Sequence, residues 1–263
     1  MTTEEIRKWD SAAANYQEVF RLGINDYNRG LLRFWQDEGM IFPGARVLDI
    51  GCGVGLYGTY LAELGCDVTL TDISGEMLGY ARENMKPCGT AWCVYQCDFR
   101  EATGKEEVFS GGFDLAISTM SPAVCDTATV RKMSGLSRGW CFLARFASWQ
   151  QPTRDLILSE TDLVRGDGDH APAGGWEEMT DIIRDAGYEP LTKLVDYSWA
   201  DARTPQQMAA NLYRTIFEGS DPDDGIISRL TEICGRYAGE DGLIIDDVNT
   251  KVIWIWWKTK EEK

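Results

Sequence analysis

The chain has 263 residues, with 26 Lys or Arg against 42 Asp or Glu, which gives a formal net charge of −16 at pH 7. This length is typical of one large domain, and the acidic charge is unfavourable for binding nucleic acid or an anionic membrane surface. The N-terminus lacks the apolar stretch of a signal peptide, and the longest apolar run, residues 252–257, is too short to span a membrane. We therefore expect a cytoplasmic protein whose partner is a small molecule; the sequence indicates no oligomeric state.

The cysteines and the single histidine restrict the chemistry further. The eight cysteines form no C-x-x-C pair, and a chain with this much core needs no disulfide framework, so we expect reduced and mostly buried thiols. The one histidine is His170. A histidine-built metal site or a Cys–His nucleophile is therefore not expected, and no metal is predicted.

Two amphipathic helices are predicted before residue 40. Helical spacing of apolar residues marks the first helix, and a similar stripe over residues 24–35 marks the second. Gly39 and the pair Pro43-Gly44 end this region. The stripe of the first helix consists of Ile6, Trp9, Ala13, Tyr16 and Phe20.

From residue 45 the pattern changes to strands that alternate with helices. Strands are predicted at 46–50, 67–71, 91–96, 113–118 and 139–146, with helices at 55–64, 76–85 and 127–135; residues 101–109 are ambiguous. This alternation is typical of an α/β fold with a parallel sheet and helices on both faces.

The last third of the chain predicts further helices and strands. We expect a helix at 176–186, a sixth strand at 188–197, and two helices that begin at Thr204 and Asp221 and end by Tyr237. Residues 242–245 and 251–258 read as separate final strand segments. No helix follows the last strand, so it is predicted to enter the sheet antiparallel to its neighbour.

The strongest motif follows the first strand, where residues 47–55 read V-L-D-I-G-C-G-V-G. Three alternating glycines after a buried strand let the backbone turn tightly and let a ligand lie against bare amides. Residues 53–58 also satisfy the dinucleotide pattern G-x-G-x-x-G, and Asp72 lies near the position expected for a ribose-binding acid. The loop alone therefore permits a nicotinamide cofactor.

Asp49 favours a different ligand. A carboxylate two residues before the first glycine suits an ammonium group and repels a pyrophosphate. S-adenosylmethionine carries an ammonium and a sulfonium and has no phosphate. The charge pattern therefore predicts S-adenosylmethionine as the cofactor.

These residues resemble motif I of the class I S-adenosylmethionine-dependent methyltransferases. Residues 70–84 are similar to that superfamily's second strand and helix, 97–99 to the acidic position after the third strand, and 113–118 to the fourth strand. Residues 9–16 resemble the N-terminal helix of its small-molecule and quinone-biosynthesis-like branch. The resemblance implies a Rossmann-like, seven-stranded, mostly parallel sheet with an antiparallel last strand, N-terminal helices and a helical lid.

The resemblance also implies an organisation for the chain. Residues 1–263 would form a single methyltransferase domain. Residues 1–40 would be an N-terminal helical cap, 45–148 a cofactor-binding core, and 149–175 and 204–238 acceptor-side insertions. An apolar stripe in the second insertion, made of Met208, Leu212, Ile216 and Phe217, would line an acceptor pocket.

The resemblance implies a role for each residue of the cofactor site. Asp49 and the three glycines would hold the methionine end, Asp72 the ribose hydroxyls, and Asp98 the adenine amino group. The remaining positions would pack on the adenine, lie near the methyl group, or close over the pocket. The full set is Tyr16, Asp49, Gly51, Gly53, Gly55, Asp72, Ile73, Met77, Asp98, Phe99, Ser118 and Met120.

The acceptor side is less specific. Residues 118–124, S-T-M-S-P-A-V, are similar to the Ser-Pro-Pro-aromatic motif of nucleic-acid amino-methyltransferases but lack its second proline and its aromatic residue. His170 lies in a Gly/Asp/Pro loop typical of a solvated histidine, and the sequence identifies no catalytic base. The predicted function is methyl transfer from S-adenosylmethionine to a small-molecule acceptor. The alternatives are an NAD-dependent oxidoreductase and a non-catalytic S-adenosylmethionine-binding subunit.

Overall fold

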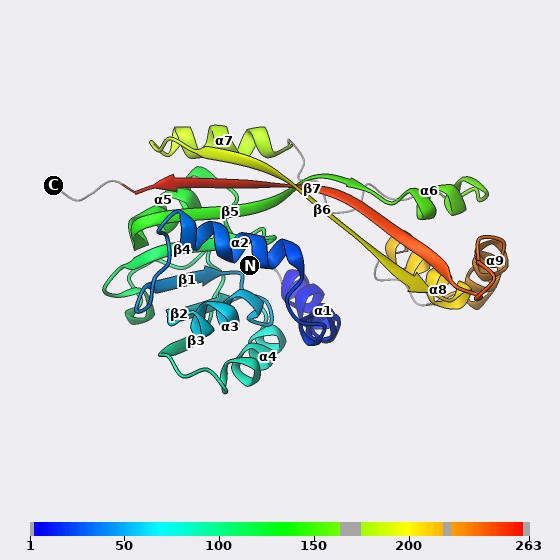
Figure 1. Cartoon of the computed structure of the whole chain (residues 1–263), viewed down its shortest axis with the longest axis horizontal. Helices are drawn as coiled ribbons and strands as arrows, with labels where there is room; N and C mark the ends of the chain where they lie inside the picture. The colour runs from blue at the N-terminus through cyan, green and yellow to red at the C-terminus, as the bar shows by residue number, and fades with distance from the viewer. Residues whose placement is uncertain (1–2, 164–174, 218–221, 260–263) are drawn as a thin grey trace. The chain divides into compact units, whose positions relative to one another are not determined.

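A seven-stranded sheet organises the chain in a computed structural model that describes residues 3–163, 175–217 and 222–259 (Figure 1). The strand order is β3-β2-β1-β4-β5-β7-β6. Strands β1 to β5 pair in parallel, and β7 runs against its neighbours, which confirms the predicted topology. The strands are β1 (Arg46–Ile50), β2 (Asp67–Asp72), β3 (Trp92–Gln96), β4 (Phe113–Thr119), β5 (Ser137–Gln150), β6 (Leu191–Arg203) and β7 (Ile244–Lys258).

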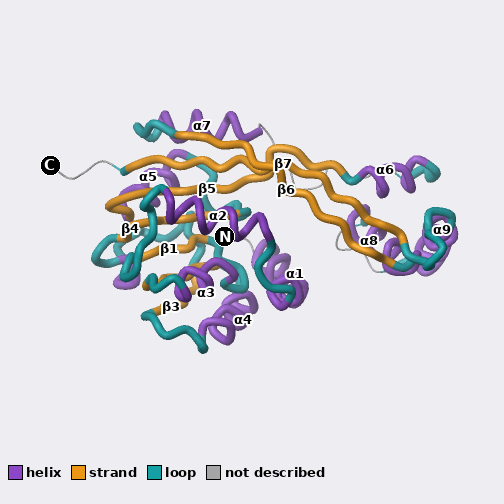
Figure 2. The backbone as a smooth tube through the Cα atoms, viewed as in Figure 1, coloured by secondary structure: helices purple, strands orange, loops and turns teal. Residues whose placement is uncertain are grey.

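Helices connect the strands, as the tube in Figure 2 shows. Several begin at a side chain that accepts a backbone N–H, which satisfies groups that a helix leaves unpaired at its start. Thr204, for example, forms a capping box with Gln207. The helices are α1 (Thr3–Arg21), α2 (Asp26–Asp37), α3 (Leu56–Glu63), α4 (Gly75–Met85), the 3₁₀ turn η1 (Glu107–Phe109), α5 (Thr127–Leu136), α6 (Pro152–Ser159), α7 (Gly175–Asp185), α8 (Pro205–Ile216) and α9 (Asp224–Gly235).

The chain divides into two compact units. Unit 1 comprises Met1–Arg145, Trp176–Lys193 and Trp254–Lys263, and unit 2 comprises Phe146–Gly175 and Leu194–Ile253. The three long strands β5, β6 and β7 contribute residues to both units. Both segments that we expect to be insertions belong to unit 2; their role toward the acceptor stays a prediction.

Unit 1 buries the apolar faces of its parallel strands under large aromatic side chains. Trp35 of α2 is fully buried and meets Phe142 of β5 edge to face, with ring centroids 5.2 Å apart. Trp257 of β7 is also fully buried, and its indole nitrogen donates to the hydroxyl of Ser134 at 2.9 Å. Buried aromatic residues contribute strongly to a core of this kind, although the indole nitrogen of Trp35 has no hydrogen-bond partner among the described residues.

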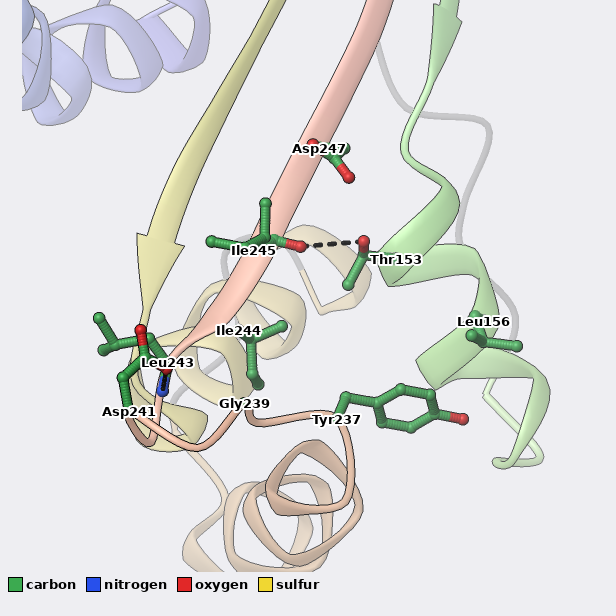
Figure 3. A pocket seen from close by; sticks show the side chains of 9 residues that line it. All are labelled: Thr153, Leu156, Tyr237, Gly239, Asp241, Leu243, Ile244, Ile245 and Asp247. Carbon is green, nitrogen blue, oxygen red and sulfur yellow. Dashed lines mark hydrogen bonds between the residues drawn. The ribbon is translucent and has the colours of Figure 1, made fainter.

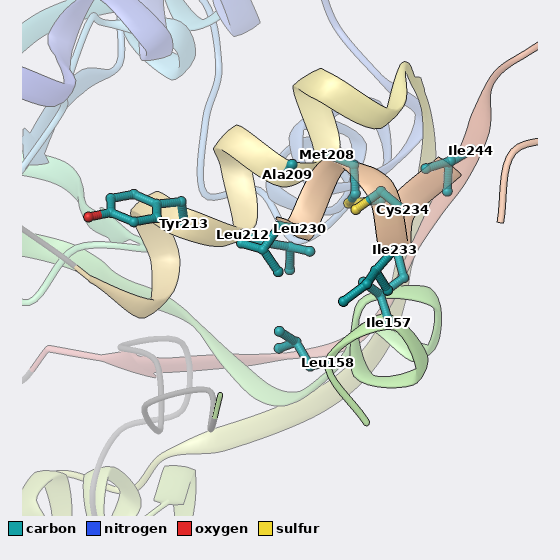
Figure 4. Packing of buried hydrophobic residues seen from close by; sticks show 10 residues of the cluster. All are labelled: Ile157, Leu158, Met208, Ala209, Leu212, Tyr213, Leu230, Ile233, Cys234 and Ile244. Atoms are coloured by element: carbon teal, nitrogen blue, oxygen red, sulfur yellow. The ribbon is translucent and has the colours of Figure 1, made fainter. Parts of the chain in front are cut away.

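Unit 2 has its own apolar core, which Figure 4 shows from close by. Helices α6, α8 and α9 and the start of β7 supply its buried side chains. Beside it Asp246 is fully buried and accepts both Nε and Nη2 of Arg154, at 2.8 and 2.5 Å, and Nε of Arg203 at 2.9 Å. The core consists of Ile157, Leu158, Met208, Ala209, Leu212, Tyr213, Leu230, Ile233, Cys234 and Ile244.

The structure corrects several predicted elements. β7 is one continuous strand where two segments were predicted, because the inward Asp246 is neutralised by two arginines and leaves the alternation of buried residues intact. β6 begins after Pro190 and extends to Arg203, since proline lacks the N–H that a ladder needs. Helix α6 was not predicted, and residues 101–109 contain only η1. His170 lies outside the described residues.

The cysteines differ from expectation in their burial. All eight are free, but only Cys66, Cys141 and Cys234 are buried, and Cys93 and Cys125 are exposed. The expectation of mostly buried thiols was therefore wrong. The exposed pair lies on an edge strand and in the loop before α5, where the sheet leaves side chains uncovered.

Candidate functional site: the carboxyl ends of the parallel strands

The glycine loop joins β1 to α3 in a conformation that requires glycine. Gly51, Gly53 and Gly55 all have positive φ, at 73°, 55° and 82°, which side chains rarely adopt. The amides of Gly51 and Cys52 both donate to the carbonyl oxygen of Thr71, at 2.7 and 2.9 Å. A Cβ atom at Gly51 would lie 1.9 Å from Oγ of Ser121. The loop is therefore held between the ends of β2 and β4 with no room for a side chain.

Asp72, the last residue of β2, holds this loop from the other side. Its Oδ2 accepts the backbone N–H of Gly53 and its Oδ1 accepts that of Ser74, both at 2.9 Å. Burial raises the pKa of Asp72, and the charge of Asp10 raises it too, against the lowering effect of these backbone hydrogen bonds. A carboxylate has further lone pairs for a ligand's hydroxyl groups.

Asp49 is the least satisfied polar group of the site. It is 1% exposed, and neither carboxylate oxygen has a hydrogen-bond partner among the described residues. Burial, and next the charge of Asp72, raises the pKa of Asp49 from 3.8 to about 8. A buried carboxyl group without a partner is rare in proteins. Its chemistry fits a ligand that brings a positive charge, as the ammonium of S-adenosylmethionine does.

The end of β3 carries an acid that is already paired. Both oxygens of Asp98 accept from Arg100, Oδ1 from Nε at 3.0 Å and Oδ2 from Nη2 at 2.9 Å. Arg100 also bridges to Glu5 of α1 at 3.0 Å. Burial alone would raise the pKa of Asp98, but the hydrogen bonds and charge of Arg100 lower it overall. Asp98 is thus fixed as a carboxylate, with lone pairs left for an amino group.

The segment after β4 is strained. Met120 has a φ of 51°, which is unusual for a residue with a long side chain and is often found at functional sites. The Met120 amide donates to the carbonyl oxygen of Ala144 at 3.0 Å. Ser118 is fully buried, and its Oγ has no hydrogen-bond partner among the described residues. The conformation of this segment brings Ser121 against Gly51.

Helix α1 packs against α4 beside the loop. Ala13 of α1 lies in one buried cluster with Val54 and Met77. The carboxylate of Asp10 accepts the hydroxyl of Ser74 at 2.5 Å. Burial of the phenol, and next the charge of Asp72, raises the pKa of Tyr16, while 47% of this residue stays exposed.

The remaining predicted residues lie at the same edge. Met77 is 2% exposed, and its sulfur would lie 3.9 Å from a Cβ at Gly53. The carbonyl oxygen of Ile73 accepts the side-chain amide of Gln96 at 3.0 Å. Phe99 is buried, and its carbonyl oxygen accepts Nζ of Lys132 at 2.7 Å. The structure gathers the predicted residues at the ends of β1 to β4, and their individual roles stay predictions.

Three residues of this edge were missed by the sequence prediction. Arg100 follows Asp98 by two positions. An acid and a base this close to the end of a predicted strand could have indicated their ion pair. Ser121 lies in the segment 118–124 that the sequence indicates for the acceptor side, but its contact with Gly51, like the contacts of Arg145, joins segments that are distant in the sequence. No group of three or more metal-binding side chains occurs within the described ranges 3–163, 175–217 and 222–259.

Unit 2 holds a separate surface pocket (Figure 3). The hydroxyl of Thr153 donates to the carbonyl oxygen of Ile245 across it at 3.0 Å. Its other side chains are mostly apolar, with two carboxylates. The lining residues are Thr153, Leu156, Tyr237, Gly239, Asp241, Leu243, Ile244, Ile245 and Asp247.

The fold and the glycine loop, with acids at the ends of β1 and β2, have the arrangement typical of class I S-adenosylmethionine-dependent methyltransferases. Residues 47–137 match the family described as "Methyltransferase domain". This match and the relatives below support a class I S-adenosylmethionine-dependent methyltransferase with S-adenosylmethionine as its cofactor. Among the described helices, none is long and apolar enough to cross a membrane.

Individual relatives agree with this assignment. The chain is 28% identical over 184 residues to a ubiquinone biosynthesis O-methyltransferase of Burkholderia pseudomallei, covering 60% of this chain and 75% of that protein. It is 35% identical over 82 residues to the enzyme of the same name from Dechloromonas aromatica, covering 30% of this chain and 33% of that one.

Solved structures share the fold at low identity. The magnesium protoporphyrin IX methyltransferase of Synechocystis, with bound S-adenosylhomocysteine, aligns with a TM-score of 0.51 and 19% identity, over 73% of this chain and 93% of that one. A Haemonchus contortus phosphoethanolamine N-methyltransferase in complex with S-adenosyl-L-methionine aligns with a TM-score of 0.51 and 17% identity, over 95% of this chain and 57% of that one.

Proposed function

We propose that this protein transfers the methyl group of S-adenosylmethionine to a small-molecule acceptor. The observation that carries the proposal is the buried carboxyl of Asp49, which has no partner among the described residues, beside a glycine loop whose Gly53 amide is bound by Asp72. The net charge of −16 disfavours a nucleic-acid acceptor. The ubiquinone-biosynthesis relatives act on small molecules by name and support the same class of acceptor.

The residues of the site would act by binding and orientation. When bound, S-adenosylmethionine supplies a methyl group on a positively charged sulfur, which an acceptor displaces in line. Asp49 would hold the ammonium end, and Asp72 would accept the ribose hydroxyls. The bare amides of the glycine loop let the backbone approach closely. A fixed donor lowers the entropic part of the barrier for a bimolecular transfer.

The acid at β3 and the N-terminal helix would complete the donor site. Asp98, fixed by Arg100, would accept the adenine amino group, and Met77 would pack on the ring. Tyr16 would cover the donor from α1. We also propose a cytoplasmic location, which the eight free cysteines support because thiols stay reduced there.

Calorimetry with S-adenosylmethionine and with NAD tests the donor directly. We expect S-adenosylmethionine to bind and NAD not to bind; the reverse would favour an oxidoreductase. Turnover is then followed as S-adenosylhomocysteine released with a panel of small hydroxylated, amine and thiol acceptors. Tight cofactor binding with no product from the whole panel would favour a non-catalytic subunit.

A further inference from the structure

Arg145 lies in the second half of β5, one residue beyond the position that pairs with the carboxyl end of β4. It follows Ala144, which pairs in register with Thr119 at the end of β4. Ligands of open α/β sheets bind at this edge. The segment that carries the strained Met120 lies next to it, so Arg145 lies beside the residues predicted to surround the methyl group.

The guanidinium of Arg145 contacts only neutral groups. Its Nη1 donates to the carbonyl oxygens of Ser118 and Ala144, both at 2.9 Å, and its Nη2 donates to that of Val124 at 3.0 Å. No carboxylate of the described residues pairs with it. These bonds leave Nε–H and one N–H of Nη2 without an acceptor in the described part of the chain, since a guanidinium has five N–H groups.

Other arginines of this chain show what those two N–H groups bind. Arg154 uses Nε and Nη2 together to hold the carboxylate of Asp246. Arg138 does the same with Asp114, at 2.8 and 3.0 Å. This edge of the guanidinium matches two oxygens of a carboxylate or a phosphate. At Arg145 the same edge has no such partner.

The unpaired positive charge of Arg145 is energetically unfavourable in its buried position. Burial lowers the pKa of Arg145 to about 10, and a cation withdrawn from water without a counter-ion destabilises the fold. The residue as a whole is half-buried. In a chain with a net charge of −16, an unpaired cation at a ligand-binding edge is a specific recognition element for an anion.

We propose that Arg145 anchors an anionic group of the methyl acceptor, a carboxylate or a phosphate, through Nε and Nη2. The inference rests on the proposed function and narrows the acceptor class. The three carbonyl bonds fix the guanidinium, so its free edge is preorganised. A neutral acceptor would leave the charge uncompensated, whereas an anionic one forms a charge-assisted bidentate pair.

The test uses the protein saturated with S-adenosylhomocysteine and two probes, benzoate and inorganic phosphate. Calorimetric titration should show binding of one of them; benzoate identifies a carboxylate subsite and phosphate a phosphate subsite. Arg145→Gln should weaken that binding about tenfold or more, as expected for the loss of one charge-assisted pair. Arg131→Gln is the matched control, because Arg131 also donates to a carbonyl, that of Asp185 at 2.9 Å, and is exposed.

Several results would overturn the proposal. Failure of the wild-type protein to bind either probe, or equal binding by the Arg145→Gln variant, means that Arg145 only holds the carbonyl oxygens of Ser118, Val124 and Ala144 in place. If that variant does not fold, labelling of the wild-type protein with phenylglyoxal decides the matter. Benzoate or phosphate must then slow modification of Arg145, as measured by peptide mass spectrometry, and an unchanged rate contradicts the anchor.

The same samples separate this inference from the proposed function. Binding of S-adenosylmethionine to the wild-type protein is measured first and does not involve Arg145. If the cofactor does not bind, the proposed function itself fails. If it binds while the probes do not, the methyltransferase assignment stands and only the anion anchor is lost.

Discussion

The carboxylate of Asp72 accepts the backbone N–H of Gly53, with Oδ2 2.9 Å from the amide nitrogen. This bond joins the end of β2 to the glycine loop that follows β1. The strands β1 and β2 are parallel neighbours in the sheet. The acid that would bind the ribose therefore also fixes the loop that would bind the methionine end. Loss of its carboxylate affects both parts of the donor site.

Asp72→Ala should weaken S-adenosylmethionine binding by about 2–3 kcal/mol, because a charge-assisted bidentate contact is lost. Calorimetry measures the change. Asp67→Ala is the control: Asp67 begins the same strand, and among the described residues its Oδ1 accepts only the Ala91 amide, at 3.1 Å. Equal affinity of the Asp72→Ala variant and the wild type would remove Asp72 from the site.

Gly51→Ala should abolish cofactor binding and destabilise the fold. The new Cβ would lie 1.9 Å from Oγ and 2.6 Å from Cβ of Ser121, at a φ of 73°, so the loop or the segment after β4 must move. Gly79→Ala is the matched control, because a Cβ there meets nothing within 4 Å. In a helix that change should stabilise by about 0.5–1 kcal/mol. Thermal unfolding and calorimetry report both effects, and a Gly51→Ala variant that binds normally would show that the loop is not close-packed.

The buried Asp49 predicts a pH dependence of stability in the ligand-free protein. Its pKa is about 8 in the folded state against 3.8 ordinarily, so the folded protein holds this proton more tightly than the unfolded chain. The contribution of Asp49 is therefore complete below about pH 4 and is lost as the pH rises towards 8. Asp49→Asn should remove that loss, so the variant should gain stability relative to the wild type between pH 5 and pH 8.

Cofactor binding should release this proton. At pH 7 the carboxyl is mostly protonated, and the ammonium of S-adenosylmethionine favours the ionised form. Calorimetry in buffers of different ionisation enthalpy measures the number of protons released. We expect release by the wild type and a smaller release by Asp49→Asn. The same release from both proteins would assign the proton to another group.

Residues 1–21 should be needed for turnover but not for formation of the sheet. Helix α1 covers Met77 and Val54 and pairs Glu5 with Arg100 beside Asp98. Deleting residues 1–21 should leave a folded sheet by circular dichroism and abolish release of S-adenosylhomocysteine. A double change of the exposed pair Glu18 and Arg21 to Ala should leave turnover unchanged, since exposed ion pairs contribute little. Full activity of the truncated protein would make α1 dispensable.

Much of the donor site was predictable because its signals are local. The glycine spacing, the strand before it and the acid Asp72 lie in short contiguous patterns, and the structure brings them together. The contact of Gly51 with Ser121 was not predictable, because it depends on how the ends of β1 and β4 meet. Arg145 reads as an interruption in an apolar strand, and only the folded chain shows that it contacts three carbonyls.

The C-terminal part was harder to predict for a physical reason. In the sequence, the two acids Asp246 and Asp247 indicate a break between two strands. In the structure, ion pairs with Arg154 and Arg203 allow Asp246 to face inward. Neither arginine is near it in sequence. The continuous strand therefore could not be predicted from the periodicity of apolar residues.

Leu212 tests whether the apolar stripe of α8 lines a pocket or forms a core. We expected this stripe to wall an acceptor pocket, but Leu212 is 1% exposed and belongs to the buried cluster of unit 2, together with Leu230 of α9 and Ile157 of α6. Leu212→Ala should therefore cost about 2–5 kcal/mol of unfolding free energy, through lost apolar burial and the cavity that remains.

Denaturant unfolding followed by tryptophan fluorescence measures this loss, because Trp149 and Trp199 lie in unit 2 and report on it. Leu156→Ala is the matched control: Leu156 lies on α6 in the same unit but is 54% exposed, and such a surface change should alter stability by less than about 0.5 kcal/mol. The donor-site residues belong to unit 1, so both variants should bind S-adenosylmethionine within about twofold of the wild type. If Leu212→Ala kept full stability and changed only the apparent affinity of an acceptor, the side chain would line a pocket after all.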